Sequence, residues 1–180
     1  MNNSMKIKQV FAKPLQEIIS LEEVKEYLKI DFSEQDKFIS NTIVAAREYA
    51  EKFLSTHLVK KEFFQMHLGQ NLQTITLVHK PILEIKSLSI INREREVITL
   101  DQKEYYFDQF NEISISKLAA LYNLIEVKYT VGYENPDLIP MPLKTGMLMH
   151  VASIYDRGDL GDAIPQSTLN LYQPYRRSHL

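Results

Sequence analysis

The side chains that could do chemistry in this chain are histidines, carboxylates and a serine, and their spacing decides whether they form a reactive centre. The five histidines are scattered: His57, His67, His79, His150 and His179. No two of them stand four residues apart, the spacing that places two zinc ligands on one helix face. His150 and Asp156 are six residues apart, whereas neighbours on one helical face lie three or four apart. We therefore interpret His150 as a packed or interface histidine.

Three carboxylates near the amino terminus, Glu22, Glu23 and Glu26, could be imagined as a metal or acid–base group. Glu22 and Glu26 share a helical face, but they lie in the first turns of an expected helix, where the dipole favours negative charge. Ser153 lacks the glycine-flanked turn that exposes a nucleophilic serine, and nothing marks a partner base. The sequence therefore gives no positive support for an enzyme.

The composition excludes further kinds of site. The chain has no cysteine, which rules out disulfides, thiol nucleophiles, iron–sulfur clusters and cysteine-ligated zinc. Its five glycines form no phosphate-binding loop, so we expect no cofactor. No apolar run approaches the roughly 20 residues that span a bilayer. The amino terminus also lacks an apolar signal core, so we expect cytoplasmic synthesis and no membrane partner.

An aromatic segment raises a second possibility, a stacking surface for nucleic acid. Its aromatic and basic residues are Tyr105, Tyr106, Phe107, Phe110, Arg93, Arg95 and Lys103. Acidic residues are interleaved with them: Asp101, Glu104, Asp108 and Glu112. The net charge of the chain is −2, so no basic surface would neutralise phosphates there. Specific DNA binding is not favoured, and core packing explains the aromatic residues.

Two helices joined by a tight turn are expected near the start of the chain. Ser20 and Glu23 have the spacing of a capping box, which predicts a short helix over about 20–29. Ser33 to Asp36 repeats that signature and predicts a longer helix over about 34–54. Small residues at Ala45, Ala46 and Ala50 permit close approach by another helix. Residues 1–19 show no sustained period and are expected to form an extended arm.

The hydrophobic period then changes from helical to alternating. Strands are expected over 72–79, 82–91, 97–100, 105–108, 113–115 and 125–131, and a weaker pattern favours another over 59–68. The connections are too short for crossover helices, so the strands should pair antiparallel. We therefore predict an α+β fold in which a small antiparallel β module, about 59–131, is inserted into a helical core.

The last predicted helix spans about 142–157, with Gly158 as its stop. It carries two apolar stripes. One consists of Leu143, Met147, Val151 and Ile154, and the other of Leu148, Ala152 and Tyr155. A helix that is apolar on two sides needs two packing partners, and we expect the second to be a neighbouring subunit. Residues 159–180 lose periodicity and are expected to form a carboxy-terminal arm outside the connector domain, 20–158.

Several segments, in this order, resemble the tailed-phage head–tail connector (adaptor) family, in particular its subgroup with a β insertion. They are Ile19–Asp31, Ile43–Glu51, Lys80–Leu88, Val127–Tyr133, Ile139–Pro140, Leu143–Lys144 and Tyr155–Gly158. Each motif is weakly specific, and their order and spacing carry the resemblance. The sequence departs from the family at His57–Leu58, where many members have a glycine, and the last twenty residues match nothing in it.

The resemblance implies a structural virion protein, without catalytic, cofactor or metal residues, at the head–tail interface of a virus, prophage remnant or gene transfer agent. It implies a ring of about twelve copies beneath the portal, with a tail-side connector or stopper protein below and DNA passing through the channel. We predict the portal-binding arm as Leu171, Tyr172, Tyr175, Arg176 and Arg177. We predict the subunit interface as Leu148, Ala152 and Tyr155, and the acidic channel wall as Glu22, Glu23 and Glu26.

Two alternatives remain open. Members of the resembled family are also labelled DNA-packaging proteins, so the first is an accessory that binds DNA directly. The second is an uncharacterised enzyme, which would depend on His150 or Glu22.

Overall fold

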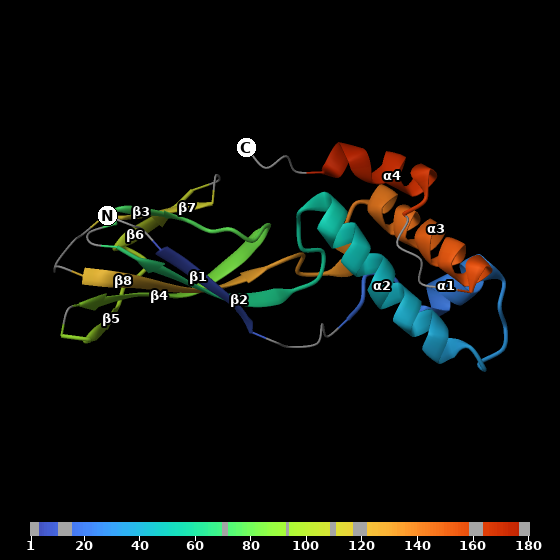
Figure 1. The fold of residues 1–180 in the computed structure, drawn as a ribbon, viewed down its shortest axis with the longest axis horizontal. Coiled ribbons are helices and arrows are strands. Elements are labelled where there is room, and N and C mark those ends of the chain that lie inside the picture. Colours follow the sequence, from blue (N-terminus) through green and yellow to red (C-terminus); the bar gives the residue numbers. More distant parts are fainter. Residues whose placement is uncertain are drawn as a thin grey trace. The chain divides into compact units, whose positions relative to one another are not determined.

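The chain divides into two units, each built from two separate stretches of sequence. The computed structural model describes residues 4–10, 16–69, 72–92, 94–108, 111–116, 122–158 and 164–176. Met1–Lys13 and Lys60–Gly132 form one unit, the β unit, and Pro14–Val59 and Tyr133–Leu180 form the other, the helical unit. The fold is α+β, as the sequence predicts, and Figure 1 labels its elements.

The helical unit contains four α-helices among its described residues. They are α1 (Leu21–Leu28), α2 (Asp36–Leu54), α3 (Met141–Arg157) and α4 (Gln166–Tyr172), with short 3-10 helices η1 (Pro136–Leu138) and η2 (Gln173–Tyr175). Helix α1 begins with the predicted capping box, in which the Ser20 hydroxyl accepts from the Glu23 amide and the Glu23 carboxylate accepts from the Ser20 amide. Helix α3 ends as predicted at Gly158, whose φ of 72° suits glycine.

The prediction of a second capping box, at Ser33 to Asp36, is wrong. Helix α2 starts at Asp36, its N-cap residue is Gln35, and no side chain caps it. The Asp36 carboxylate instead accepts a hydrogen bond of 2.8 Å from the Lys25 ammonium group on α1. The carboxylate expected at the start of α2 therefore ties the two helices together.

The helical core is formed where α1, α2 and α3 pack together. Buried apolar side chains from these helices, their flanking segments and the end of α4 form one cluster: Ile18, Ile19, Val24, Ile39, Ile43, Ala46, Ala50, Leu54, Leu58, Val59, Ile139, Leu143, Met147, Val151 and Tyr172. Ala46 and Ala50 are fully buried in α2, in keeping with the close approach that their size permits, whereas Ala45 is only partly buried. Ile18 and Ile19 belong to this core, although the sequence placed them in an arm.

The carboxy-terminal segment differs more from expectation, because Gln166–Tyr172 is helical and packs on α3 (Figure 1). Tyr172 is fully buried in the helical core. The sequence pattern did not predict this helix because it is only seven residues long and has no capping side chain. The described part of the segment is therefore a part of the core and not an arm.

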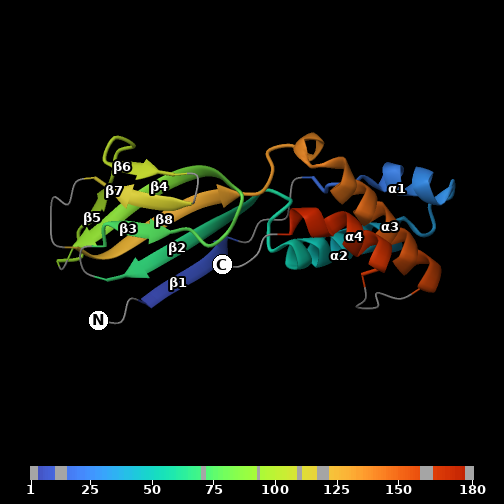
Figure 2. The ribbon, with the colours of Figure 1, turned by 90° about the horizontal axis from the view of Figure 1, so that it is seen from above.

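The β unit contains two antiparallel sheets. The larger one has the strand order β1-β2-β8-β4-β5 and the smaller one β3-β7-β6. The strands are β1 (Ser4–Val10), β2 (Lys61–Leu68), β3 (Thr74–Thr76), β4 (Ile82–Asn92), β5 (Val97–Thr99), β6 (Tyr105–Phe107), β7 (Glu112–Ile115) and β8 (Tyr122–Val131). Figures 1 and 2 show the smaller sheet stacked over one face of the larger. The strands are too substantial for the small inserted module that the sequence predicts.

The core of the β unit lies between the two sheets. Alternate residues of β8, Ile125, Val127, Tyr129 and Val131, are fully buried. Ile75 and Leu77 from the β3 segment and Ile113 from β7 cover them. This alternation is typical of a strand with one buried face. The seven strands expected between residues 59 and 131 are therefore confirmed, with shifted ends.

Strand β1 is the element that the sequence analysis missed. Part of the expected amino-terminal arm, Ser4–Val10, pairs antiparallel with β2 from Ser4 opposite Leu68 to Val10 opposite Glu62. This makes β1 an edge strand of the larger sheet. Its alternation of Met5 and Ile7 with Lys6 and Lys8 is short, and its partner lies more than fifty residues away in the sequence. A local pattern of this length does not distinguish such a strand from an extended arm.

Candidate functional site

All three groups of predicted site residues fall in the helical unit. The predicted channel residues lie on α1. Glu22, Glu23 and Glu26 are all exposed, and the Glu23 carboxylate is held 2.6 Å from the Ser20 amide in the capping box. Glu23 therefore stabilises the start of the helix, whereas Glu22 and Glu26 are exposed and take no part in the capping box.

The two stripes of α3 differ in burial. Leu143, Met147, Val151 and Ile154 face the core with at most 2% exposure, as expected for the inner stripe. The second stripe, Leu148, Ala152 and Tyr155, is only partly buried. Leu148 and Tyr155 also pack against the helical core, and the Tyr155 ring lies 6.3 Å from that of Phe38 on α2. The chain itself thus covers part of the second stripe and leaves part accessible.

The predicted portal-binding residues do not form one surface. Tyr172 is buried and Leu171 is half-buried against the core, while Tyr175 and Arg176 are exposed. The Arg176 guanidinium lies 5.0 Å from the centroid of the Phe53 ring on α2, a cation–π contact. Arg177 lies outside the described residues. Of the five predicted residues, Tyr175 and Arg176 are therefore the exposed ones among those that the structure describes.

A close helix contact explains why α4 stays on α3. A Cβ atom added at Gly146 would stand 2.5 Å from a ring carbon of Tyr172, so only glycine leaves room for the ring. Beside it, the Thr168 hydroxyl donates to the Gly146 carbonyl oxygen at 3.3 Å. Burial raises the pKa of the Tyr172 phenol well above its usual range. Gly146 is the sequence signal that could have predicted a tight contact on this face of α3.

His150 on α3 is a packed histidine, as predicted. It is fully buried, and its ring lies 5.6 Å from that of Tyr49. Neither ring nitrogen has a hydrogen-bond partner among the described residues. Burial, assisted by the charge of Arg157, lowers the pKa of His150 to about 4. The imidazole is therefore neutral near pH 7, and no group of three histidine, aspartate or glutamate side chains in the described ranges could hold a metal ion.

Sequence reasoning missed a buried ion network in the helical unit. The Arg47 Nε donates to the Glu17 carboxylate at 2.8 Å, and its Nη1 donates to Glu51 at 3.2 Å. The other oxygen of Glu51 accepts from the Leu58 amide at 2.9 Å and from the Val59 amide at 3.4 Å. Burial alone would lower the pKa of Arg47, but the hydrogen bond to Glu17 and the surrounding carboxylates raise it.

This network lies close in sequence to two of the three places where the chain passes between units. Glu17 precedes α1, just after the first β-unit segment, and Leu58 and Val59 are the last residues before the second. The i, i+4 spacing of Arg47 and Glu51 is the only local signal for it. The distant partner Glu17 could not be identified from spacing.

The β unit contains a buried hydrogen-bond network like that of Arg47, but without charged groups. The Gln65 amide donates to the Thr76 carbonyl at 2.7 Å and accepts from the Val78 amide at 3.2 Å. The Tyr129 hydroxyl donates to the same Gln65 oxygen at 2.8 Å, and burial raises the pKa of Tyr129 to about 12. Gln65 lies on the inner face of β2 between Phe63 and His67, opposite the buried Val127.

None of the helices in the described part of the chain is long and apolar enough to cross a membrane. The described structure offers accessible helical surfaces and one packed interior in each unit. It presents no cluster of reactive side chains in the residues it covers.

Comparison with known proteins agrees with this description. A sequence model of head completion proteins matches residues 17–157. No curated protein sequence matches the chain. A chain from the neck of an empty gene transfer agent particle, computed with C6 symmetry, has a similar fold with a TM-score of 0.72, 16% identity and 97% of each chain covered.

Two further solved chains share the fold. One belongs to the virion of a native gene transfer agent particle, with a TM-score of 0.73, 17% identity, and 97% of this chain and 96% of that one covered. The other belongs to the neck of a native particle computed with C12 symmetry, with a TM-score of 0.62, 15% identity and 97% of each chain covered. Both units are therefore present in those chains.

Proposed function

The chain belongs to the head completion protein family, a family of structural proteins and not of enzymes, and from this membership we propose that it is a ring subunit of the neck between the head and tail of a phage-like particle. The observation that carries the proposal is that its two-unit fold matches 97% of a neck chain while its sequence matches the family over residues 17–157. In this role it acts by holding positions and not by chemistry.

The finer proposal is an adaptor ring of about twelve copies that docks beneath the portal and links it to the tail. The matched neck chains come from assemblies computed with C6 and C12 symmetry, which supports a ring. A ring requires two different surfaces on each copy that fit one another. The accessible part of Leu148, Ala152 and Tyr155 on α3 is proposed as one of them.

Two further parts of the proposal concern partners. Exposed Glu22 and Glu26 on α1 would face the channel, because like charge lets DNA pass without sticking. Tyr175 and Arg176, exposed at the end of the carboxy-terminal segment, would contact the portal. Leu171 and Tyr172 are withdrawn from that role, since they pack in the helical core.

The test is to image the purified protein by negative stain, alone and mixed with the portal of the same particle, in parallel with sedimentation. We expect rings docked on the portal for the native chain. Leu148→Glu and Ala152→Glu should abolish rings while the circular dichroism spectrum stays native, because each places a charge in the α3 face. Thr145→Glu, an exposed position on the same helix, is the matched control and should still form rings.

The outcomes separate the parts of the proposal. A native chain that remains monomeric at high concentration and ignores the portal overturns the ring function. Rings formed equally well by all three variants would move the interface away from α3. A salt-dependent shift of labelled duplex by the native chain would favour the alternative of a DNA-binding packaging accessory.

A further inference from the structure

The larger sheet of the β unit has two open margins. At one end, β1 pairs only with β2, so the other edge of Ser4–Val10 has no partner strand among the described residues. At the other end, β5 pairs with β4 only at Ser89, Ile90 and Ile91. The first half of β4, from Ile82 to about Ser87, therefore also presents an edge without a partner strand in the described part of the chain.

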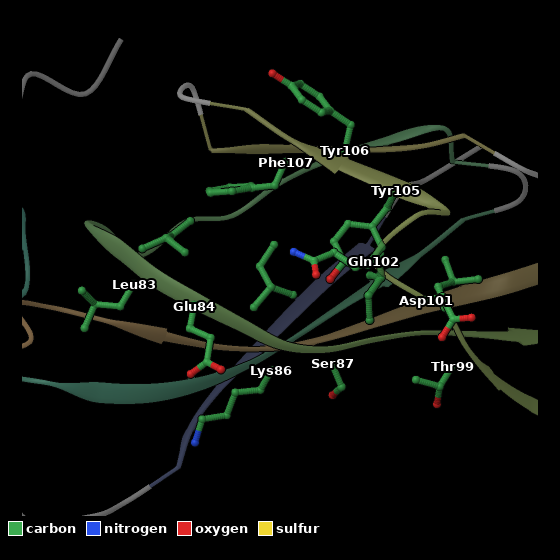
Figure 3. A pocket seen from close by; sticks show the side chains of 14 residues that line it. Leu83, Glu84, Lys86, Ser87, Thr99, Asp101, Gln102, Tyr105, Tyr106 and Phe107 are labelled. Carbon is green, nitrogen blue, oxygen red and sulfur yellow. The ribbon is translucent and has the colours of Figure 1, made fainter.

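A groove runs along the open half of β4. Its volume is about 730 Å³, and it is lined by β4 on one side and by Tyr105 and Phe107 of β6 on the other. Figure 3 shows Tyr105 turned toward β4, while Glu84, Lys86 and Ser87 point to the opposite face of that strand. An open strand edge beside an aromatic-lined groove is the arrangement that accepts an added strand.

The charges at the two margins are complementary. Strand β1 carries exposed Lys6 and Lys8. The margin of β4 carries exposed Glu84 and Asp101, whereas its Lys86 is already paired with Glu62 on β2. The β4 margin therefore has acidic groups to offer a basic strand.

The registers place Lys6, Lys8 and Glu84 on one face of the larger sheet. Lys8 stands opposite Phe64, Phe64 opposite Lys128, and Lys128 opposite Ser87. In the same way, the row from Val10 through Glu62 and Thr130 ends at Glu84. Because residues in register share a face of the sheet, Lys6 and Lys8 lie on the face that carries Glu84, away from the smaller sheet.

The apolar residues of β1 lie on the other face. Met5 and Ile7 stand opposite His67 and Gln65, the inner face of the sheet, yet they are 48% and 37% exposed. If the sheet continued from β4 into a further β1, these two side chains would enter the groove beside Tyr105 and Phe107. Charged and apolar residues of β1 thus both meet suitable partners in a single arrangement.

We propose that β1 of one copy adds to the open edge of β4 in a second copy, so that the larger sheets join head to tail. The strands β1, β2, β8 and β4 alternate in direction, so a second copy in the same orientation brings its β1 antiparallel to β4. This contact is heterologous and closes when successive copies turn about an axis. The inference deepens the proposed ring function and rests on it.

Both strand edges carry features that limit which strands can pair with them, and these features fit the pairing of β1 with β4. Lysines on an edge strand and bulges in its partner discourage indiscriminate strand pairing. Strand β4 has register irregularities between Ile82 and Glu84 and between Ile85 and Ser87. An edge shaped in this way pairs with a strand that matches its twist and charge, and β1 supplies the charge.

The chain has no native cysteine, so introduced cysteines report the contact directly. One population would carry Lys6→Cys or Lys8→Cys, and the other Glu84→Cys. The full-length proteins would be mixed under ring-forming conditions and oxidised, and covalent dimers would be scored by non-reducing gel. We expect dimers in the mixture for at least one of the two lysine positions, and at least a tenfold lower yield when either population is oxidised alone.

The controls separate this contact from the ring function. Glu134→Cys, an exposed position in the helical unit, replaces Glu84→Cys as the matched control and should give no dimer with either lysine variant. Rings visible in negative stain without the mixed dimer overturn the strand contact and leave the ring function standing. Dimers from a lysine variant alone would indicate β1 pairing with β1 and also overturn it.

Charge reversal provides a second measurement that does not depend on oxidation. Lys6→Glu with Lys8→Glu in one copy, or Glu84→Lys with Asp101→Lys in the other, should each reduce assembly by about tenfold in sedimentation. Mixing the two reversed proteins should restore heterologous dimers, since each then offers its partner the opposite charge. Failure of that restoration, with all variants folded, contradicts the charge-selective pairing.

Discussion

The two units solve the same structural problem with different side chains. In the helical unit, Glu51 accepts from the Leu58 and Val59 amides where the chain leaves regular structure. In the β unit, the Gln65 side chain forms hydrogen bonds with the Thr76 carbonyl at the end of β3 and with the Val78 amide just beyond it. In both places one side chain replaces a missing main-chain partner, as buried peptide groups require.

The difference lies in charge. Glu51 is an ionised group with 7% exposure, and it requires Arg47, which in turn requires Glu17. Gln65 is neutral and fully buried, and its partners are the Tyr129 hydroxyl, main-chain groups, the His67 ring and the Met5 sulfur. Leaving a buried charge without its partner destabilises a protein more than removing a neutral buried amide does. The helical unit should therefore be the more sensitive to substitution and to pH.

The largest expected effect is that of Arg47→Leu. Removing the guanidinium leaves the Glu51 carboxylate buried without a compensating charge, and loss of one partner of a buried pair costs about 4 kcal/mol. Urea unfolding should report this decrease in the free energy of unfolding. Hydrogen–deuterium exchange should place the loss of protection in α2 and in Leu58 and Val59.

Glu48→Ala is the matched control for that variant. The Glu48 carboxylate lies 3.6 Å from Arg47 but is 66% exposed, and an exposed pair contributes about 0.5 kcal/mol. Equal losses in the two variants would contradict the importance of burial. A loss of protection confined to the β unit would contradict the assignment of the network to the helical unit.

The second effect is a pH dependence that comes from His150. The unfolded histidine takes up a proton near pH 6.5, whereas burial keeps folded His150 neutral down to about pH 4. Between these values the unfolded chain binds more protons, so stability is complete above about pH 6.5 and falls as the pH falls. At about 1.4 kcal/mol per pH unit, the loss over this window is about 3 kcal/mol.

The measurement compares the native chain with His150→Phe, which keeps a ring beside Tyr49. The difference between their urea-unfolding free energies should grow steadily from pH 6.5 to pH 4, and exchange protection should decrease first in α3. Burial also lowers the pKa of His67 and His79 in the β unit, so a smaller loss is expected there. Parallel curves for the two proteins would show that His150 is not the titrating group.

Much of the fold could be predicted because its local signals are strong. Ser20 and Glu23 define the start of α1, Gly158 defines the end of α3, and alternation defines β8. These features depend on residues close together in the sequence. The strand positions between 59 and 131 could be read for the same reason.

The elements that were missed depend on distant partners. Strand β1 exists because β2 offers it an edge, and α4 is held because Gly146 leaves room for Tyr172. Neither dependence is visible within a window of ten residues. The predicted portal arm therefore included Tyr172, whose aromatic character also suits a core.

For the candidate subunit interface, the sequence could predict only which face of α3 would be involved. The two stripes of α3 follow from a period of 3.6 residues, and the structure separates the buried stripe from the partly accessible one. The open strand edges of the β unit could not be predicted, because an edge is defined by which strands fail to pair. The role of Lys6 and Lys8 became apparent only once their strand had a place in the sheet.

The smallest of the three effects concerns the uncharged Gln65 network in the β unit. Gln65→Leu removes the groups that pair with the Thr76 carbonyl, the Val78 amide and the Tyr129 hydroxyl, and unpaired buried groups cost about 2 kcal/mol here. The cost stays below that of Arg47→Leu because no charge is left behind and because the neighbouring Thr76 and Val78 side chains are exposed to water. The midpoint of urea unfolding reports the loss, and hydrogen exchange should increase at Val78 and His79 while α2 keeps its protection.

Gln73→Leu, at an exposed position just before β3, makes the same chemical change without these contacts and should change the free energy of unfolding by no more than about 0.5 kcal/mol. If Gln65→Leu and Arg47→Leu lowered the free energy of unfolding equally, then the pairing of buried main-chain groups, and not charge, would determine how sensitive both units are to substitution.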